Sequence, residues 1–156
     1  MTKWIILSLF ALLIPVVSQQ QPLSEEQFIS MDLSQQIDCM AKNIYYEAAN
    51  EPYEGKLAVA QVTMNRTKSP QFPKTVCGVV YQKGQFSWVD EKYYPIKSQL
   101  AWQECLLVAR KALTEHKLHD TIYKTNSMYY HNTSVNPPWK LKYVAKIGNH
   151  MFYTRS

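Results

Sequence analysis

Hydrophobic positions recur at helical spacing over much of the first half of the chain. From Ser34, a residue suited to cap a helix, apolar side chains follow every three or four residues to about Ala49. Asn50-Glu51-Pro52 interrupts the pattern, and the proline is suited to open a second helix that runs to about Thr67. Apolar residues go almost all the way round this second helix, so we expect it to lie in the core.

The second half of the chain predicts two more helices and then strands. Thr75 is placed to cap a short helix through Tyr81, and a longer apolar-faced helix follows from Ser98 to about His116. The remaining segments are a strand or extended loop over 85–88, a strand over 128–131, a loop over 132–138, and strands over 143–147 and 150–153 around a Gly148-Asn149 hairpin turn. This order predicts one α+β domain, mainly helical, with a small antiparallel β-sheet.

The first 18 residues have a different character. A short positive start with Lys3 precedes an apolar stretch over residues 4–17, and Ser18 supplies a small residue after it. These features are typical of a cleavable secretory signal, and the stretch is shorter than the roughly 20 apolar residues of a spanning helix. An uncleaved, loosely inserted helix is the alternative. We therefore expect a signal peptide over 1–18, a loose lead-in over 19–33 and one catalytic domain over 34–156, exported to the periplasm, the cell wall or the extracellular space.

The charge balance narrows the class of partner. Lys and Arg number 17 against 12 Asp and Glu, which gives a net charge of +5 and a pI near 9.0. Such a field attracts anionic polymers such as nucleic acid, acidic lipid or bacterial wall. The chain has no concentrated run of basic residues, and together with the export signal this argues against nucleic acid. We expect a monomer that meets the membrane only transiently, through its signal segment.

Cysteine and histidine spacing predicts neither a metal site nor a cofactor. The three cysteines, Cys39, Cys77 and Cys105, form no C-x-x-C, and the only close histidine pair is His116 and His119. In an exported chain two of the cysteines could pair and leave one thiol free. The sequence alone does not choose the pairing.

Glu47 is the candidate for acid-base chemistry. It follows Met40 by seven residues, which places it about 20° away around the helix, at the margin of the apolar stripe and near the helix C-terminus. Partial burial and the negative end of the helix dipole both raise the pKa of a carboxyl group, as a general acid near neutral pH requires. On position alone, a surface glutamate at the rim of the stripe is the alternative.

The residues around Glu47 also carry a family resemblance. Two consecutive stretches read N-I-Y-Y-E-A-A-N-E-P-Y-E-G over 43–55 and L-A-V-A-Q-V-T-M-N-R over 57–66, and further blocks follow over 72–81, 85–88, 129–132, 138–139 and 147–153. Together these blocks, which span roughly residues 38–155, resemble the SleB-type cell wall hydrolases, the spore cortex-lytic enzyme family. Several separated blocks in the right order are far more specific than a single motif.

The resemblance implies a fold and a reaction. The family is similar in fold to lytic transglycosylases and goose-type lysozymes, and its members cleave the bond between N-acetylmuramic acid and N-acetylglucosamine in peptidoglycan. The first glutamate of its E-A-R-G-E-type motif is the catalytic acid, and Glu47 occupies that position. The sequence departs from the pattern at Ala49-Asn50, where Arg-Gly is common, and at Gly84, where many relatives have cysteine.

The number of carboxylates decides between two reactions. A hydrolase of this bond normally needs a second carboxylate, for which Asp90, Glu91 and Glu51 are the candidates; Glu51 could face the groove or merely help to cap a helix. In lytic transglycosylases one glutamate acts first as acid and then as base, and the muramic acid's own hydroxyl closes an anhydro ring. Our hypothesis is this single-acid route through Glu47. A hydrolytic muramidase and a non-catalytic peptidoglycan-binding module are the alternatives.

Neutral and aromatic side chains are the candidates for holding the glycan strand. Amides and hydroxyls bind sugar hydroxyl and acetamido groups without adding charge, and an indole can stack on a sugar ring or lie in the core. For His131 a structural role competes with a role as base. The chain has no G-x-S-x-G, so a serine hydrolase is not expected. The predicted substrate-binding residues are Gln85, Phe86, Ser87, Tyr129, His131, Asn132 and Trp139.

Overall fold

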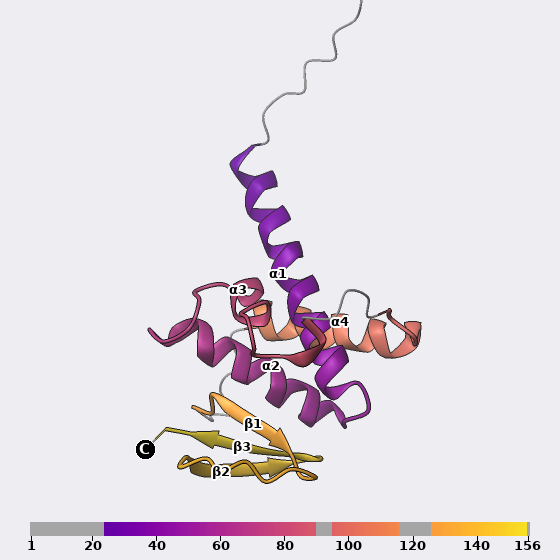
Figure 1. The fold of residues 1–156 in the computed structure, drawn as a ribbon. Coiled ribbons are helices and arrows are strands. Elements are labelled where there is room, and N and C mark those ends of the chain that lie inside the picture. The colour runs from indigo at the N-terminus through magenta and orange to yellow at the C-terminus, as the bar shows by residue number, and fades with distance from the viewer. Residues whose placement is uncertain (1–23, 90–94, 116–125, 156) are drawn as a thin grey trace, which may run out of the picture.

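The computed structural model of the protein describes residues 24–89, 95–115 and 126–155. In these ranges the helices are α1 (Glu25–Ala48), α2 (Tyr53–Lys68), α3 (Val76–Val80), the short 3-10 helix η1 (Ser87–Val89) and α4 (Gln99–Thr114), and the strands are β1 (Tyr129–Asn132), β2 (Lys142–Ile147) and β3 (His150–Thr154). Figure 1 shows the helices gathered on one side of the small sheet, with the N-terminal part of α1 projecting away from it. The predicted mainly helical α+β architecture is confirmed.

Most element boundaries follow the capping signals in the sequence. The hydroxyl of Thr75 accepts a hydrogen bond from the Gly78 amide at 3.1 Å, and the hydroxyl of Ser98 accepts one from the Ala101 amide at 3.3 Å. Such bonds satisfy amides that have no partner within the helix. The predicted starts of α3 and α4 are therefore confirmed. The predicted signal segment, residues 1–18, lies outside the described residues, and none of the helices described has the length and apolar character needed to cross a membrane.

Two predicted segments are wrong. The first helix begins at Glu25 rather than Ser34, so the loose lead-in predicted over 19–33 is helical from Glu25 onward. The sequence Ser24-Glu-Glu-Gln27 matches a helix-starting pattern with acidic residues in the first turn, which accounts for the earlier start. The strand or extended loop expected over 85–88 is instead a 3-10 turn from Ser87, closed by the Val89 amide donating to the Phe86 carbonyl at 3.2 Å. Burial of Phe86 and Trp88 among the helices outweighs strand pairing there.

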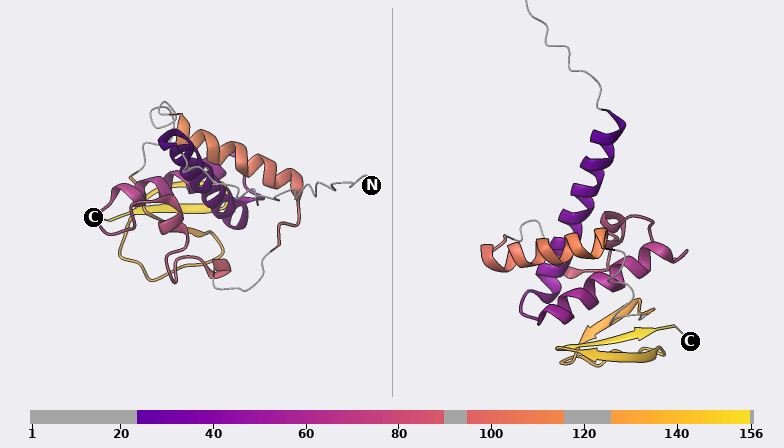
Figure 2. Two further views of the ribbon diagram at one scale, coloured as in Figure 1. Left: turned by 90° about the horizontal axis from the view of Figure 1, so that it is seen from above. Right: turned by 180° about the vertical axis from the view of Figure 1, so that it is seen from behind.

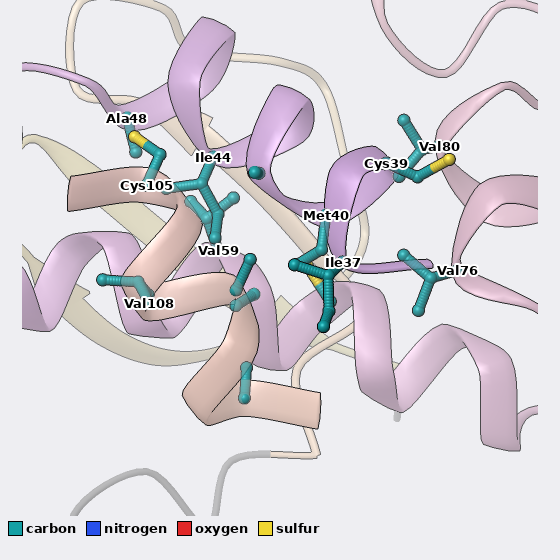
Figure 3. Packing of buried hydrophobic residues seen from close by; sticks show 14 of the residues in the cluster. Ile37, Cys39, Met40, Ile44, Ala48, Val59, Val76, Val80, Cys105 and Val108 are labelled. Carbon is teal, nitrogen blue, oxygen red and sulfur yellow. The ribbon is translucent and has the colours of Figure 1, made fainter. Parts of the chain in front are cut away.

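The main hydrophobic core surrounds the C-terminal half of α1. Met40 and Ile44 of α1 are fully buried, and Val59 of α2 and Val108 of α4 pack in the same cluster. Figure 3 shows these side chains where the three helices meet. Full burial of side chains of this size stabilises a fold by about 1.5–3 kcal/mol each. The core thus fixes the end of α1, where Glu47 lies. Leu100 and Leu107, by contrast, are exposed on α4.

The sheet packs on α2 through one face. Its strand order is β1-β3-β2, with antiparallel pairing throughout, and the predicted hairpin between β2 and β3 is confirmed. Gly148 makes the turn with φ = 57°, a left-handed conformation that favours glycine. Phe152 of β3 is buried against Ala58 and Val62 of α2. The right view of Figure 2 shows the sheet on one side of the helices, as Figure 1 does from the front.

The cysteine pairing that the sequence left open is resolved. Cys39 of α1 and Cys77 of α3 form a disulfide, with sulfur atoms 2.06 Å apart. Cys105 is free and buried in the core between α1 and α4. Because α3 is a single short turn of helix, the disulfide ties it to α1 directly.

Candidate active site

A cleft of about 620 Å³ opens where the end of α1, the last turns of α2, the loop before η1 and the sheet meet. We call four of its residues the inner wall, namely Glu47, Arg66, Phe86 and Tyr130, which are buried or half-buried. We call four others the outer rim, namely Tyr129, Trp139, Lys140 and Arg155, which are half-buried or exposed. Gly84, Gln85, Pro138 and Leu141 complete the lining.

The Glu47 carboxylate is held in place by two donors from distant parts of the chain. The indole N–H of Trp88 donates to Oε1 at 3.0 Å, and the hydroxyl of Tyr130 donates to Oε2 at 3.3 Å. Trp88 is itself buried, with its ring centroid 4.6 Å from that of Tyr46 and 5.9 Å from that of Phe86. A carboxylate held by donors whose own positions are fixed by packing keeps one orientation toward the cleft.

Burial raises the pKa of Glu47 above the ordinary value of 4.5. Desolvation is the largest cause, and the hydrogen bonds from Trp88 and Tyr130 and the positive charge of Arg66 oppose it. The direction predicted from the helix position is therefore confirmed. A carboxyl with a raised pKa that lines a cleft and has donors on both oxygens can give up a proton and can also exist as a supported anion.

Arg66 is a buried cation in the same wall. Its Nε donates to the Met128 carbonyl at 2.8 Å, and its guanidinium lies 5.1 Å from the Phe72 ring centroid and 5.8 Å from that of Phe86. Burial lowers the pKa of its guanidinium below the ordinary value, and the electrostatic influence of Tyr130, Tyr129 and Glu47 opposes that fall. The guanidinium remains a positive charge next to Glu47, since arginine stays protonated in proteins.

Tyr130 joins the sheet to the catalytic candidate. Burial raises the pKa of its hydroxyl well above 10.0, and the neighbouring Glu47 charge adds to the effect. The hydroxyl therefore stays neutral and remains a donor. Its ring packs against Phe152 at 5.7 Å and against His150 at 5.3 Å between centroids. These ring contacts hold Tyr130 within the sheet, and its hydroxyl contacts Glu47 of α1.

The outer rim is aromatic and positively charged. The Arg155 Nε donates to the Tyr129 hydroxyl at 2.9 Å, and the Trp139 ring meets the Tyr129 ring edge to face at 6.3 Å between centroids. Trp139 is 44% exposed, so much of its ring is free to contact a ligand. Exposed aromatic surface beside cations suits a polar polymer that carries negative groups.

The structure brings some predicted binding residues to the cleft and not others. Gln85, Phe86, Tyr129 and Trp139 line it. Three predicted residues do not line it, namely Ser87, His131 and Asn132. Ser87 is exposed at the start of η1, and the Asn132 side chain accepts from the Ser134 amide at 2.9 Å. The ring nitrogens of His131 lie 2.9 Å from the Asn132 carbonyl and 3.0 Å from the Tyr153 hydroxyl.

Glu51 is a correction to the sequence analysis. It is buried and does not line the cleft; its carboxylate accepts from the backbone amide of Asn149 at 2.8 Å and from the Asn149 side chain at 3.1 Å. Gly148 lies so close to this carboxylate that a side chain there would collide with it. Glu51 therefore anchors the hairpin turn to the start of α2, and the candidacy of Glu51 as a second carboxylate in the cleft is wrong. Asp90 and Glu91 lie outside the described residues.

Sequence reasoning missed four residues of the inner wall and the outer rim, namely Arg66, Tyr130, Lys140 and Arg155. Arg66 and Tyr130 stand inside the resembling blocks, and the alternation along β1 already placed Tyr130 on the face opposite Tyr129, so a signal for them existed. Lys140 and Arg155 carried no local signal, because only the sheet brings the loop before β2 and the end of β3 together. Among the residues described, no cluster of histidine, cysteine, aspartate and glutamate is suited to hold a metal ion.

Comparison with known proteins finds a matching family, similar sequences and similar solved structures. The family described as Cell Wall Hydrolase matches residues 50–153. The spore cortex-lytic enzyme of Oceanobacillus iheyensis is 34% identical over 119 residues, which cover 74% of this chain and 40% of that relative. The spore cortex-lytic enzyme of Bacillus subtilis is 31% identical over 119 residues, which cover 74% of this chain and 36% of that relative. The chain thus spans about two fifths of the length of these curated relatives. The catalytic domain of a germination-specific lytic transglycosylase, SleB from Bacillus anthracis, superposes with a TM-score of 0.58 at 31% identity, covering 76% of this chain and 93% of that domain.

Proposed function

This chain belongs to the cell wall hydrolase family, and we propose that it cleaves the bond between N-acetylmuramic acid and N-acetylglucosamine in peptidoglycan as a lytic transglycosylase. The observation that carries the proposal is the Glu47 carboxyl, which lines the cleft with a raised pKa and has a donor on each oxygen. The names of the relatives, a lytic transglycosylase and spore cortex-lytic enzymes, support this reaction class. We further propose that residues 1–18 direct export, since the substrate lies outside the cytoplasm.

In the first step Glu47 acts as the acid. Desolvation favours the neutral carboxyl, so the group retains its proton to a higher pH than an exposed glutamate does. It gives this proton to the glycosidic oxygen as the bond from that oxygen to the anomeric carbon of muramic acid breaks. Positive charge then develops on the sugar ring opposite the newly formed carboxylate, which stabilises it.

In the second step the same carboxylate acts as the base. Trp88, Tyr130 and the charge of Arg66 all favour the ionised form of Glu47, so the site supports the anion once it forms. The carboxylate takes the proton from the primary hydroxyl of the muramic acid, whose oxygen bonds to the anomeric carbon and closes the anhydro ring. Glu47 is then protonated again, and no water molecule is consumed.

The lining of the cleft favours this route over hydrolysis. A hydrolytic pair of carboxylates stands about 5–9.5 Å apart across the bond. Of the cleft-lining residues that the structure describes, Glu47 alone carries a carboxylate. A hydrolytic muramidase would need a second acid, for which Asp90 and Glu91 remain the candidates.

Mass spectrometry of digested peptidoglycan tests the proposal. We expect anhydromuramic ends, and reducing muramic ends without anhydro product would instead identify a muramidase. Glu47→Gln should lower kcat by about 10³-fold, because it removes the group used in both steps, while peptidoglycan pelleting is retained. Glu54→Gln, an exposed glutamate in the first turn of α2, is the matched control and should cleave like the parent. A parent protein that pellets with the wall but releases nothing would instead be a binding module.

A further inference from the structure

A second hollow adjoins the cleft at the outer edge of the sheet. Its volume is about 550 Å³, and it is lined by Asn126, Lys142, Tyr143, Val144, Thr154 and Arg155. Arg155 lines both this hollow and the cleft, so the two share a boundary residue. A ligand held near Glu47 can therefore extend across Arg155 into the second hollow.

The second hollow is positively charged. Lys142 and Arg155 are its ionisable cations, and none of the described residues that line it is acidic. Lys140 adds a further positive charge on the rim of the cleft. With no carboxylate of the lining to pair with them, these cations are available to an anionic ligand.

The Arg155 guanidinium is oriented by its neighbours. Its Nε donates to the Tyr129 hydroxyl at 2.9 Å, and its central carbon lies 5.9 Å from the Tyr129 ring centroid. In the part of the chain that the structure describes, this is the side-chain hydrogen bond that Arg155 makes, which leaves its two terminal nitrogens for a ligand. A planar guanidinium held on one side is suited to bind a carboxylate through two parallel hydrogen bonds.

Tyr143 gives the second hollow a wall that is half apolar. It is 51% exposed, and its ring meets that of Tyr153 edge to face at 5.8 Å between centroids. The amide of Asn126 and the hydroxyl of Thr154 add neutral hydrogen-bonding groups. Cations, an aromatic ring and neutral donors and acceptors together match a short acidic peptide better than an unsubstituted sugar.

We propose that the second hollow binds the carboxylates of the peptide that muramic acid carries, so that the chain acts on peptide-bearing glycan strands. This inference rests on the proposed function, which places a muramic acid residue beside Glu47. The peptide is attached to the lactyl group of that sugar, so a sugar in the cleft carries its peptide with it, and Arg155 borders both the cleft and the second hollow. Lys142 and Arg155 then select strands by their substituent, while Glu47 acts on the backbone.

The test compares two forms of the same soluble glycan strand in binding to the Glu47→Gln protein. One form keeps its peptides, and the other has been treated with an amidase that removes them and leaves the lactyl carboxylate. We expect the dissociation constant to be at least about fivefold lower for the peptide-bearing form, and Lys142→Glu to reduce this preference to less than about twofold. Lys146→Glu is the matched control, because Lys146 is an exposed lysine on the same strand outside the hollow, and it should keep the preference.

Three outcomes would overturn the inference. Equal affinity for the two forms of the strand would mean that the peptide is not bound. An equal loss of the preference in Lys142→Glu and Lys146→Glu would mean that general charge attraction accounts for it. Retention of the preference in both Lys142→Glu and Lys142→Gln would place the peptide elsewhere. Failure of the proposed function is separate: it would appear as no cleavage by protein with an intact Glu47, and the binding preference can be measured whatever that result is.

Discussion

The inner wall and the outer rim of the cleft face the same space, but their polar groups are held very differently. In the inner wall, the Glu47 carboxylate has a donor on each oxygen and the Arg66 side chain is fixed by a backbone carbonyl and two aromatic rings. In the outer rim, Trp139 is 44% exposed, and Lys140 and Arg155 are exposed.

The difference separates chemistry from recognition. Proton transfer needs atoms within hydrogen-bonding distance in one fixed arrangement, and small displacements cost large factors in rate. Holding a polymer with varied substituents tolerates mobile side chains, because several weak contacts share the task. We therefore expect inner-wall variants to change kcat and outer-rim variants to change KM.

The largest expected effect is that of Trp88→Phe, because Trp88 holds the inner-wall carboxylate of Glu47 from behind the cleft lining. The variant keeps an aromatic ring in the core but removes the N–H that supports the Glu47 carboxylate, and a hydrogen bond to a charged group is worth about 1.5–3 kcal/mol. We expect kcat to fall by about 10- to 100-fold. Because that hydrogen bond lowers the Glu47 pKa, the alkaline limb of the pH–rate profile should move to higher pH. Trp102→Phe, at a half-buried tryptophan of α4 outside the cleft, is the control. An unmoved alkaline limb would contradict the assignment.

A smaller effect is expected for Tyr130→Phe, which removes the longer bond of 3.3 Å. A weaker hydrogen bond of about 0.5–1.5 kcal/mol corresponds to about a twofold to tenfold loss in kcat. Tyr129→Phe sharpens the comparison, because Tyr129 is its neighbour in sequence but belongs to the outer rim, where its hydroxyl meets Arg155. Steady-state kinetics should show a change mainly in kcat for Tyr130→Phe and mainly in KM for Tyr129→Phe. The same kinetic change in both variants would erase the distinction between the two surfaces.

Trp139→Ala tests the outer rim alone. The loss of a stacking surface worth about 0.5–1.5 kcal/mol should raise KM by about twofold to tenfold and leave kcat nearly unchanged. Trp139→Phe should restore most of the lost affinity, because a smaller aromatic ring remains. Measurement on soluble glycan strands separates the two constants. A fall in kcat comparable to that of Trp88→Phe would instead make the rim part of the chemistry.

Local signals along the chain explain the part of the structure that the sequence could predict. Helical periodicity placed Glu47 at the margin of the apolar stripe, and the structure finds it there, half-buried and with a raised pKa. Caps at Thr75 and Ser98 and the Gly148 turn are local signals, so those boundaries followed from the chain itself. Such predictions hold because each depends on residues a few positions apart.

What could not be predicted depends on contacts between distant segments. Trp88 lies 41 residues from Glu47 and Tyr130 lies 83 residues from it, so neither hydrogen bond has a local signature. Glu51 illustrates the opposite error: its position in the loop after α1 suggested a second carboxylate, but Asn149, 98 residues away, takes both of its oxygens. The helical start at Glu25 was missed because Ser34 was taken as the start, although Ser24 followed by two glutamates is an earlier helix-starting signal.

The smallest effect we predict concerns stability, and it follows from the same burial that supports catalysis. A carboxyl whose pKa is raised in the folded protein binds a proton more tightly there than in the unfolded chain, so its ionisation costs stability as the pH rises from about 4.5 through the raised folded value. Glu47→Gln has no charge to desolvate, and its amide can accept from Trp88 and donate to the hydroxyl oxygen of Tyr130. Thermal unfolding should therefore show Glu47→Gln to be more stable than the parent at neutral pH, with the advantage vanishing below pH 4.5. Glu54→Gln, at an exposed position, is the control. If Glu47→Gln were instead less stable than the parent at neutral pH, the charged carboxylate would be a stabilising part of the inner wall, and the case for Glu47 as the acid would lose its physical basis.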